Sequence, residues 1–480
     1  MGAQIKWGIA FGSKQAISQE QVKLAHTIKF RKIPFAPSPI EMFSQLHERH
    51  KTVYLLESLE GPQKLAQYSF IGFNPRLSIT VKDGVAIICD EKTGAEDKQR
   101  VTNPLSPIQQ VVSRQVLPNR VLRFVGGAVG YISYDVVRYW EKVPHETRDD
   151  TGFPDIQMGV FNDGIVFDHK QKTAYYYFFG IDQSEEIMRI KKSSADLESL
   201  SFDQPKVNVT KEDFEKSVEK AKEYVRQGDI FQVVLSKRYD FRLQGDLIGF
   251  YRALRDINPS PYMYFFKAGD RQIVGSSPEM LVRVENRAVE TFPIAGTRPI
   301  AKNPAENKRL ARELLADPKE RAEHVMLVDL ARNDVGKVAA YGSVHVPEFM
   351  QVHGYSHVQH IVSRVVGNLR DGCQSFDAFK AVFPAGTVSG APKPRAMEII
   401  DELEPVRRGP YAGSVGYFSY NGNADFAITI RTLFADRDNA HIQAGAGIVA
   451  DSVPEREWFE TETKAQALMK ALELAGGKEL

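Results

Sequence analysis

The stretch Gln443-Ala-Gly-Ala-Gly-Ile-Val-Ala-Asp-Ser-Val-Pro-Glu-Arg-Glu-Trp-Phe-Glu-Thr461 is the most informative part of the chain. Its Gly445-Ala446-Gly447 segment leaves a backbone bare enough for a small anion to lie against the amide groups. Pro454 suits the first turn of a helix, on which Glu457 and Glu460 stand three residues apart and so share one face. Amides beside two carboxylates suit an acidic ligand that a divalent cation bridges to the protein.

A second acidic segment begins at Lys319 and is predicted to be helical. Its Glu320 and Glu323 lie three residues apart, next to the apolar run 325–328, which favours burial. A helical glutamate is usually only solvated, but a carboxylate beside a buried apolar run needs a partner. Magnesium needs few protein carboxylates and keeps positions for water and ligand oxygens. Glu323 with Glu457 and Glu460 would suffice as a magnesium site.

Composition excludes several classes of protein. The 480 residues are 42% apolar and 26% charged, as in ordinary globular proteins of two or more folding units. Lys and Arg number 62 against 61 acidic residues, so no overall basic field points to nucleic acid. Only Cys89 and Cys373 are present, which excludes a disulfide framework and suits a reducing compartment. No apolar run approaches a membrane span, and the N-terminus is too polar for a signal peptide, so we expect a cytoplasmic protein.

Strand-like and helix-like segments do not alternate regularly, which favours an α+β architecture over a doubly wound parallel sheet. A long helical stretch is predicted from Pro304 past Leu330. The segments 127–134 and 413–420 resemble each other, either as two similar glycine-containing strands or as traces of a duplication. The predicted divisions are a flexible N-terminal extension at 1–25, an α+β domain at 26–182, a polar linker at 183–208 and a second domain at 209–480.

Two glycine-rich segments match nucleotide motifs only loosely. The run 445–450 lacks the helix that opens directly on the glycines of a dinucleotide fingerprint, and no βαβ unit surrounds it. The run 385–393 lacks the spacing and the Lys-Ser/Thr ending of a phosphate loop. A nucleotide-dependent enzyme is therefore the weakest candidate.

Six motifs occur in the order that is typical of one enzyme family. They are Gly228-Asp-Ile-Phe-Gln-Val-Val-Leu-Ser236, Ser276-Ser-Pro-Glu279, Phe292-Pro-Ile-Ala-Gly-Thr-Arg298, Glu323-His324, Ala385-Gly-Thr-Val-Ser-Gly-Ala-Pro392 and the 443–461 stretch. Together they closely resemble the motifs of the chorismate-utilising enzymes, and in particular of anthranilate synthase component I. The resemblance implies mixed, mostly antiparallel sheets that form a large sandwich flanked by helices. It further implies a regulatory-type domain at 26–182 and a chorismate-binding catalytic domain at 209–480.

Two positions discriminate within this family. Members that add water to chorismate resemble one another in carrying a lysine base where this chain has Gln232, and an amide cannot deprotonate water. Members that make 4-amino-4-deoxychorismate typically carry a lysine where this chain has Ala295. The resemblance thus implies that ammonia and chorismate give anthranilate and pyruvate, as in tryptophan biosynthesis. An aminodeoxychorismate synthase component I of the folate pathway and a non-catalytic tryptophan-binding subunit remain alternatives.

The resemblance also implies roles for individual residues. Glu323 and Glu460, with Glu457, would hold Mg²⁺ against the ring carboxylate. Glu279 would protonate the departing 4-hydroxyl, and His360 would help remove the proton whose loss lets pyruvate leave. Gln232 and Thr387 complete the implied catalytic set. The implied substrate-binding residues are Gly296, Thr297, Gly386, Tyr417, Arg431, Gly445, Ala446 and Gly447.

A second site and a partner are implied as well. The segments with Glu57-Ser58 and with Pro261-Tyr262-Met263 resemble those that bind tryptophan as an inhibitor in the family, although a strand end packed on a turn would also explain the apolar residues. Neither Cys89 nor Cys373 lies on the glycine-flanked elbow that glutamine hydrolysis needs. We therefore expect the chain to use free ammonia, or ammonia from a separate glutamine amidotransferase subunit, component II.

Overall fold

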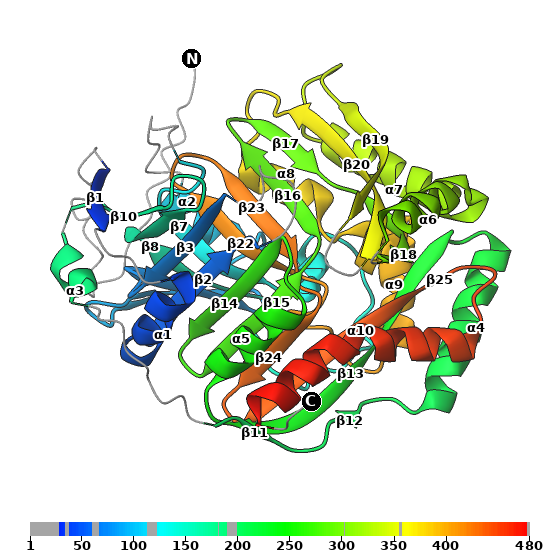
Figure 1. The fold of residues 1–480 in the computed structure, drawn as a ribbon, viewed down its shortest axis with the longest axis horizontal. Coiled ribbons are helices and arrows are strands. Elements are labelled where there is room, and N and C mark those ends of the chain that lie inside the picture. Colours follow the sequence, from blue (N-terminus) through cyan, green and yellow to red (C-terminus); the bar gives the residue numbers. More distant parts are fainter. Residues whose placement is uncertain are drawn as a thin grey trace, which may run out of the picture.

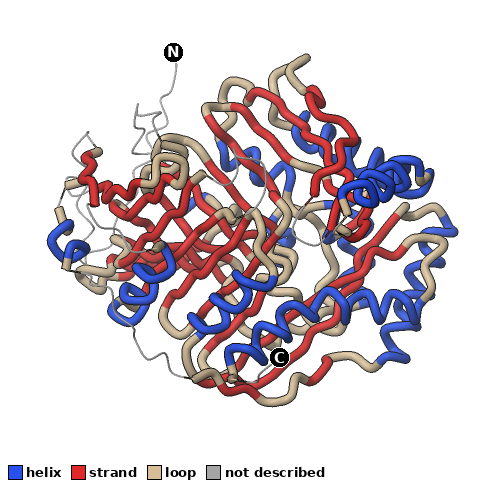
Figure 2. The backbone as a smooth tube through the Cα atoms, in the orientation of Figure 1, coloured by secondary structure: helices blue, strands red, loops and turns tan. Residues whose placement is uncertain are grey.

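The computed structural model describes residues 28–33, 38–59, 67–112, 122–180, 182–189, 199–301, 303–354 and 358–477. Two large sheets of antiparallel strands face each other, with helices at the periphery (Figures 1 and 2). This confirms the predicted α+β sandwich. The predicted extension at 1–25 lies outside the described residues. No described helix is both long and apolar enough to cross a membrane.

The first sheet has 13 strands. In spatial order they are β1 (Lys29–Ile33), β10 (Thr173–Phe178), β9 (Asp163–Asp168), β3 (Tyr68–Phe73), β2 (Thr52–Glu57), β14 (Tyr262–Ala268), β15 (Arg271–Ser277), β24 (Thr432–Asp436), β25 (Asn439–Ile448), β13 (Gln232–Gln244) and β11 (Ser201–Phe202), with β12 (Lys206–Val207) and β21 (Gly390–Ala391) also paired to β13.

The second sheet has 12 strands. Their order is β18 (Ile294–Pro299), β20 (Val358–Asn368), β17 (Ala288–Thr291), β16 (Met280–Glu285), β23 (Ala424–Ile428), β22 (Ser414–Ser419), β7 (Gly127–Ile132), β8 (Ile156–Phe161), β4 (Leu77–Lys82), β5 (Val85–Asp90) and β6 (Glu96–Arg100), with β19 (His345–Gly354) paired to β20. The two similar segments of the sequence are neighbours here, because β7 pairs with β22 and Gly130 lies opposite Gly416.

The helices fall into two groups. Three of them cover the outer face of the first sheet: α1 (Pro39–Arg49), α5 (Leu247–Ile257) and α10 (Pro454–Ala475) (Figure 1). The others are α2 (Ser106–Val112), α3 (Ser184–Met188), α4 (Lys211–Gln227), α6 (Pro304–Ala316), α7 (Pro318–Gly336), α8 (Ser375–Val382) and α9 (Lys393–Leu403), with the short 3₁₀ helices η3 (Tyr134–Tyr139) and η4 (Gly386–Val388).

Strand periodicity divides the core into two layers. Along β2, Val53 and Leu55 pack in the cluster under α1, α5 and α10, whereas Tyr54 between them packs in the cluster between the sheets. Successive side chains of a strand point to opposite faces, so the first sheet is buried on both sides. This explains why strands such as β2 and β14 are near-continuous apolar runs rather than alternating ones.

The long helical stretch predicted from Pro304 is two helices. It is broken at Asp317, whose side chain accepts hydrogen bonds from the amides of Lys319 and Glu320 and so caps the second helix, α7. Pro318 enforces the break because a proline lacks the amide hydrogen and clashes with the preceding turn. The new start of α7 sets the direction in which Glu323 points.

Each sheet contains strands that precede residues 183–208 in the sequence and strands that follow them. In the first, β2 pairs with β14, and in the second, β7 pairs with β22, so strands far apart in sequence lie side by side (Figure 1). The two predicted domains therefore share their sheets and their cores. The boundaries at 182, 183, 208 and 209 stay a prediction.

Candidate active site

Glu279 lies between β15 and β16, at a point where the chain passes from the first sheet to the second. Thr387 of η4 donates a hydrogen bond from Oγ1 to Glu279 Oε1 at 2.7 Å. Burial raises the pKa of Glu279 to about 7, although this hydrogen bond and the positive charges of Lys464 and Arg431 act in the opposite direction. A carboxyl with this pKa is suited to give up a proton near neutral pH.

His360 of β20 has the character of a base. Its Nδ1 lies 2.7 Å from the carbonyl oxygen of Gly296 and 3.2 Å from Oγ1 of Thr297. A carbonyl oxygen only accepts, so Nδ1 carries the hydrogen and Nε2 keeps a lone pair. Burial, and then the charge of Arg431, lower the pKa of His360, while the Gly296 carbonyl raises it. The ring is therefore neutral near pH 7.

Arg431 lies within electrostatic reach of both groups. Burial lowers its own pKa, and the charge of Glu279 raises it. Its backbone φ of 50° lies in the left-handed region that non-glycine residues seldom adopt, and its Nη1 donates to Asn258 Oδ1 at 3.4 Å. A half-buried guanidinium between an acid and a base is suited to bind a substrate carboxylate.

Two glycines predicted at the site lie in close contact with side chains of the neighbouring helices. Gly296 has φ of +66°, and a Cβ there would lie 2.8 Å from Leu314 Cδ1 and 2.9 Å from Glu320 Oε2. A Cβ at Gly386 would lie 2.3 Å from Leu330 Cδ2 on α7. The positive φ at Gly296 favours glycine, and at both positions an added Cβ would make the end of a neighbouring side chain shift, so both segments lie directly against the helices behind them.

The segment Gly445–Gly447 is the end of β25 rather than a loop. One edge of this segment pairs with β13, whereas β24 pairs with β25 only as far as Ile442, so among the described strands the other edge has no neighbour. The carbonyl of Gly445 accepts a hydrogen bond from Lys464 Nζ at 2.8 Å and so lies on that open edge. The N–H and C=O of one strand residue point to the same edge, so the Gly445 amide lies on the open edge as well. The Gly445 amide therefore lies on an edge that no described strand covers.

Three predicted metal ligands gather between α7 and α10. Burial, followed by the charges of Glu320 and Glu460, raises the pKa of Glu323, and burial and the charge of Glu460 raise the pKa of Glu457. Such mutual effects require the carboxylates to be neighbours. Glu460 is paired to Lys464 at 2.8 Å. Within the described ranges no three acidic, histidine or cysteine side chains already surround one point. Oxygen donors with this excess of negative charge fit Mg²⁺.

Gln232 and Ala446 support the same wall of the site. Gln232 begins β13, and a Cβ at Gly447 would lie 2.4 Å from its Nε2, so this glycine makes room for the amide. Ala446 is fully buried in the sheet. Tyr411, which the sequence analysis did not single out, lies nearby, because its hydroxyl is 2.9 Å from the Cβ position of Gly445. The signal for it is the run Arg408-Gly-Pro-Tyr-Ala-Gly413, which places a tyrosine among turn residues just before a strand.

Tyr417 does not join this group. Its buried ring packs on Phe70 and Phe124, with ring centroids 6.3 and 4.6 Å apart, in a pocket between the two sheets. The same pocket is lined by Glu57, Ser58, Pro261, Tyr262 and Met263, the residues of the predicted second site. The tyrosine of β22 therefore belongs to the second pocket, because the alternation of side chains along the strand turns it toward the space between the sheets.

The second pocket has fixed polar groups. Glu57 accepts from the hydroxyl of Tyr251 at 2.7 Å and lies 3.5 Å from Nε of Arg255. The hydroxyl of Tyr262 donates to Asp425 at 2.9 Å. Ser58 Oγ is buried and has no hydrogen-bond partner among the described residues. A buried hydroxyl without a partner is costly, and a ligand can supply one.

Comparisons with known proteins show what this chain is similar to. A family model described as chorismate binding enzyme matches residues 22–470. Anthranilate synthase component 1 of Methanothermobacter thermautotrophicus is 48% identical over 438 residues, covering 91% of this chain and 93% of that protein. The component 1 protein of Pseudomonas aeruginosa is 43% identical, covering 93% of this chain and 95% of its own.

Solved structures give the same result for the fold. Anthranilate synthase component I from Streptococcus pneumoniae matches with a TM-score of 0.75 and 38% identity, covering 85% of this chain and 93% of its own. The isochorismate synthase MenF from Escherichia coli matches with a TM-score of 0.72 and 18% identity, covering 94% of this chain and 97% of its own. At that identity the second match concerns the fold alone.

Proposed function

This chain belongs to the chorismate-binding enzymes, in the group of the anthranilate synthase component 1 proteins, and we propose that it converts chorismate and ammonia to anthranilate and pyruvate. The observation that carries the proposal is the pairing of the acid Glu279 with Thr387, with Arg431 within electrostatic reach of both Glu279 and the base His360. The reaction would make the chain a lyase of tryptophan biosynthesis.

The acid and the base act in turn. Glu279 gives its proton to the 4-hydroxyl of chorismate, which leaves as water while ammonia adds to the ring, and the new ammonium group then loses a proton, which restores the acid. His360 accepts a ring proton at Nε2, the ring becomes aromatic, and the departing enolpyruvyl group takes up a proton at its methylene carbon to become pyruvate. Gln232 cannot act as a base toward water, whereas ammonia is already nucleophilic. This difference favours amination over hydration.

Binding groups hold the substrate for these steps. Arg431 and the open-edge amide of Gly445 bind its carboxylates, and the loops with Gly296-Thr297 and Gly386-Thr387 line the ring. Glu323, Glu457 and Glu460 are the residues that would hold Mg²⁺. When bound, the ion neutralises negative charge on the ring carboxylate.

The test is anthranilate formation from chorismate and ammonium, with and without Mg²⁺, followed by its fluorescence and mass. We expect Glu323→Gln and Glu460→Gln to lower the rate by at least a hundredfold, because each keeps its size but loses a charged ligand. Glu455→Gln is the matched control, since Glu455 lies on the same helix and pairs with Lys211 at the surface. A product other than anthranilate, such as 4-amino-4-deoxychorismate, would overturn the proposal, as would full activity of both variants.

Two partners belong to the proposal. A separate glutamine amidotransferase, component II, would supply ammonia, since the two cysteines, Cys89 and Cys373, lie in sequence contexts unsuited to glutamine hydrolysis. L-Tryptophan would bind the pocket of Glu57, Ser58, Pro261, Tyr262 and Met263 as an inhibitor. Asn258 supports such control, because it begins the segment that walls this pocket and also holds Arg431.

A further inference from the structure

A buried ion pair lies directly behind the candidate active site. Arg408 and Glu404 are 2% and 6% exposed, and the guanidinium is joined to the carboxylate by Nε at 2.9 Å and Nη2 at 2.6 Å. Removing two charges from water costs about as much as their attraction returns, so such a pair is weak evidence for stability. Its position points to another reason for its presence.

The guanidinium joins segments that carry predicted catalytic residues. Nη1 donates to the carbonyl of Val388 at 2.7 Å, at the end of η4, and thus one residue after Thr387. Nη2 donates to the carbonyl of Val234 at 2.7 Å, two residues after Gln232 on β13. With the two bonds to Glu404, four of the five N–H groups of the guanidinium are used.

Glu404 extends the link to the glycine strand. It accepts hydrogen bonds from both the amide and the hydroxyl of Ser236 at 2.8 Å, and that hydroxyl accepts from Gln443 Nε2 of β25 at 2.8 Å. The guanidinium also lies 4.8 Å from the ring of Tyr134 and 5.7 Å from that of Tyr411, whose hydroxyl faces Gly445. The pair therefore touches the supports of η4, β13 and β25 together.

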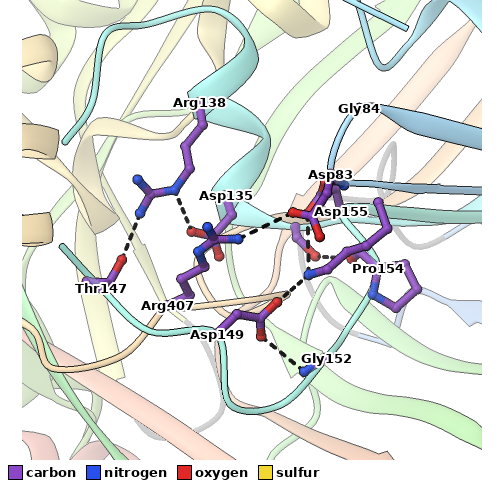
Figure 3. Close-up of polar contacts among 12 residues, drawn as sticks. Asp83, Gly84, Asp135, Arg138, Thr147, Asp149, Gly152, Pro154, Asp155 and Arg407 are labelled. Atoms are coloured by element: carbon purple, nitrogen blue, oxygen red, sulfur yellow. Dashed lines mark hydrogen bonds and ion pairs between the residues drawn. The ribbon is translucent and has the colours of Figure 1, made fainter. Parts of the chain in front are cut away.

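The chain around this pair is anchored from the far side. Asp135 accepts from the amide of Gly409 at 2.8 Å, next to Arg408. Figure 3 shows the cluster to which Asp135 belongs: Arg138 reaches Asp135 and Thr147, and Arg407 reaches Asp83. The backbone on both sides of Arg408 is thus held, by Asp135 at Gly409 and by the hydrogen bond from the Arg407 amide to the Arg148 carbonyl at 2.9 Å, which restricts where the guanidinium can lie.

We propose that Arg408 is a positioning residue, which sets η4 relative to β13 and β25 and thereby aims Thr387 at Glu279. This inference rests on the proposed function. A lysine at 408 keeps the charge but offers three donors on a flexible stem, so it cannot hold Glu404, Val388 and Val234 in one plane. The 3₁₀ helix would then shift against β13. A shift of about 1 Å at a catalytic group costs on the order of a hundredfold in rate.

Arg408→Lys is tested by steady-state kinetics with chorismate and ammonium at saturating Mg²⁺. We expect kcat to fall about 10- to 100-fold, with a smaller change in KM. The alkaline limb of the kcat profile should also move to higher pH. Thr387 stabilises the charged form of Glu279, so a weaker bond leaves this acid protonated to higher pH, while Lys464 and Arg431, which also face it, keep their positions.

Arg238→Lys is the matched control. Arg238 is buried like Arg408, and it lies on β13. It is bound to Asp150 by two hydrogen bonds of 2.9 and 2.7 Å and to Asp240 at 2.7 Å, and both partners lie outside the active-site segments. For Arg238→Lys we expect a fall in melting temperature similar to that of Arg408→Lys. We expect its kcat and the alkaline limb of its kcat profile to be unchanged. If Arg408→Lys does not fold, Glu404→Gln, which keeps the size of the partner, takes its place.

The outcomes separate the two proposals. Kinetics of the 408 or 404 variant that match those of Arg238→Lys would overturn the positioning role and leave the proposed function intact. A wild-type protein that does not consume chorismate would overturn the proposed function itself. A fall in kcat with an unmoved alkaline limb would also count against the inference, because it would show that Thr387 still reaches Glu279.

Discussion

At the residue scale, the charge state of Glu279 should control the rate. Its pKa of about 7 means that the acid is protonated below neutral pH and loses its proton above it. The general acid must be protonated to act, so kcat should fall as the pH rises through about 7. Replacing the carboxyl by an amide removes the proton, and Glu279→Gln should lower kcat about 10²- to 10⁴-fold.

The measurement is kcat for anthranilate formation between pH 5.5 and 9 in both proteins. Glu279→Gln should lose the alkaline limb as well as the rate. Thr387→Val, which removes the hydrogen bond but keeps the shape, serves as the comparison, and its limb should move to higher pH because a bond to the charged form is lost. If Glu279→Gln kept the alkaline limb of the kcat profile unchanged, the group that titrates there would be another residue.

Single residues were predictable from motifs only where the backbone fixes their direction. Arg431 lies within electrostatic reach of both Glu279 and His360, and Gly296 and Gly386 lie directly against side chains of α6 and α7. Tyr417 was predicted in the substrate site but lines the second pocket, since a tyrosine on a strand can face either side and the motif does not say which. Tyr411 was missed because it lies on a turn whose direction only the tertiary structure sets.

At the element scale, the paired strands β7 and β22 depend on their glycines. A Cβ at Gly416 would lie 2.0 Å from the carbonyl oxygen of Asp425 in the next strand, β23. Backbone of a central strand cannot move aside, so Gly416→Ala should cost about 1–3 kcal/mol of the free energy of unfolding. Urea unfolding followed by tryptophan fluorescence measures this loss.

Gly249→Ala is the opposite case and the control. Gly249 lies within α5, and its added Cβ would meet nothing closer than Ala475 Cβ at 3.8 Å. Alanine is the better helix former, so this substitution should raise stability by about 0.5–1 kcal/mol. If Gly416→Ala and Gly249→Ala changed the free energy of unfolding equally, the close contact between β22 and β23 would relax without cost, contrary to this prediction.

Elements themselves were predictable where local chemistry is decisive. The capping residue Thr210 begins α4, and Pro454 begins α10. The break between α6 and α7 at Asp317 was missed, although Pro318 is its cause, because helix-forming residues stand on both sides of it. Strand pairing was outside the reach of periodicity, which gives the face of a strand and not its neighbour.

At the scale of the whole molecule, the two domains predicted from the sequence share both sheets of the fold. The register Met263↔Glu57 joins residues 206 positions apart, and only the folded chain shows such a pairing. One consequence is that the pocket of the second site has walls from both sheets, with Ser58 and Met263 on one side and Val415 and Tyr417 on the other. A ligand there would contact both sheets at once.

L-Tryptophan should therefore inhibit the enzyme and raise its melting temperature, and Ser58 should contribute to both effects. Its buried Oγ lacks a partner among the described residues, so Ser58→Ala removes an unsatisfied group and should leave the ligand-free stability unchanged or slightly higher. The same change removes a hydrogen bond to the ligand and should weaken inhibition about tenfold.

Ser414→Ala is the matched control, because Ser414 Oγ is likewise buried without a described partner but does not line the pocket. Thermal shifts and inhibition curves with L- and D-tryptophan measure both quantities, and equal inhibition of the two variants would place the effector elsewhere.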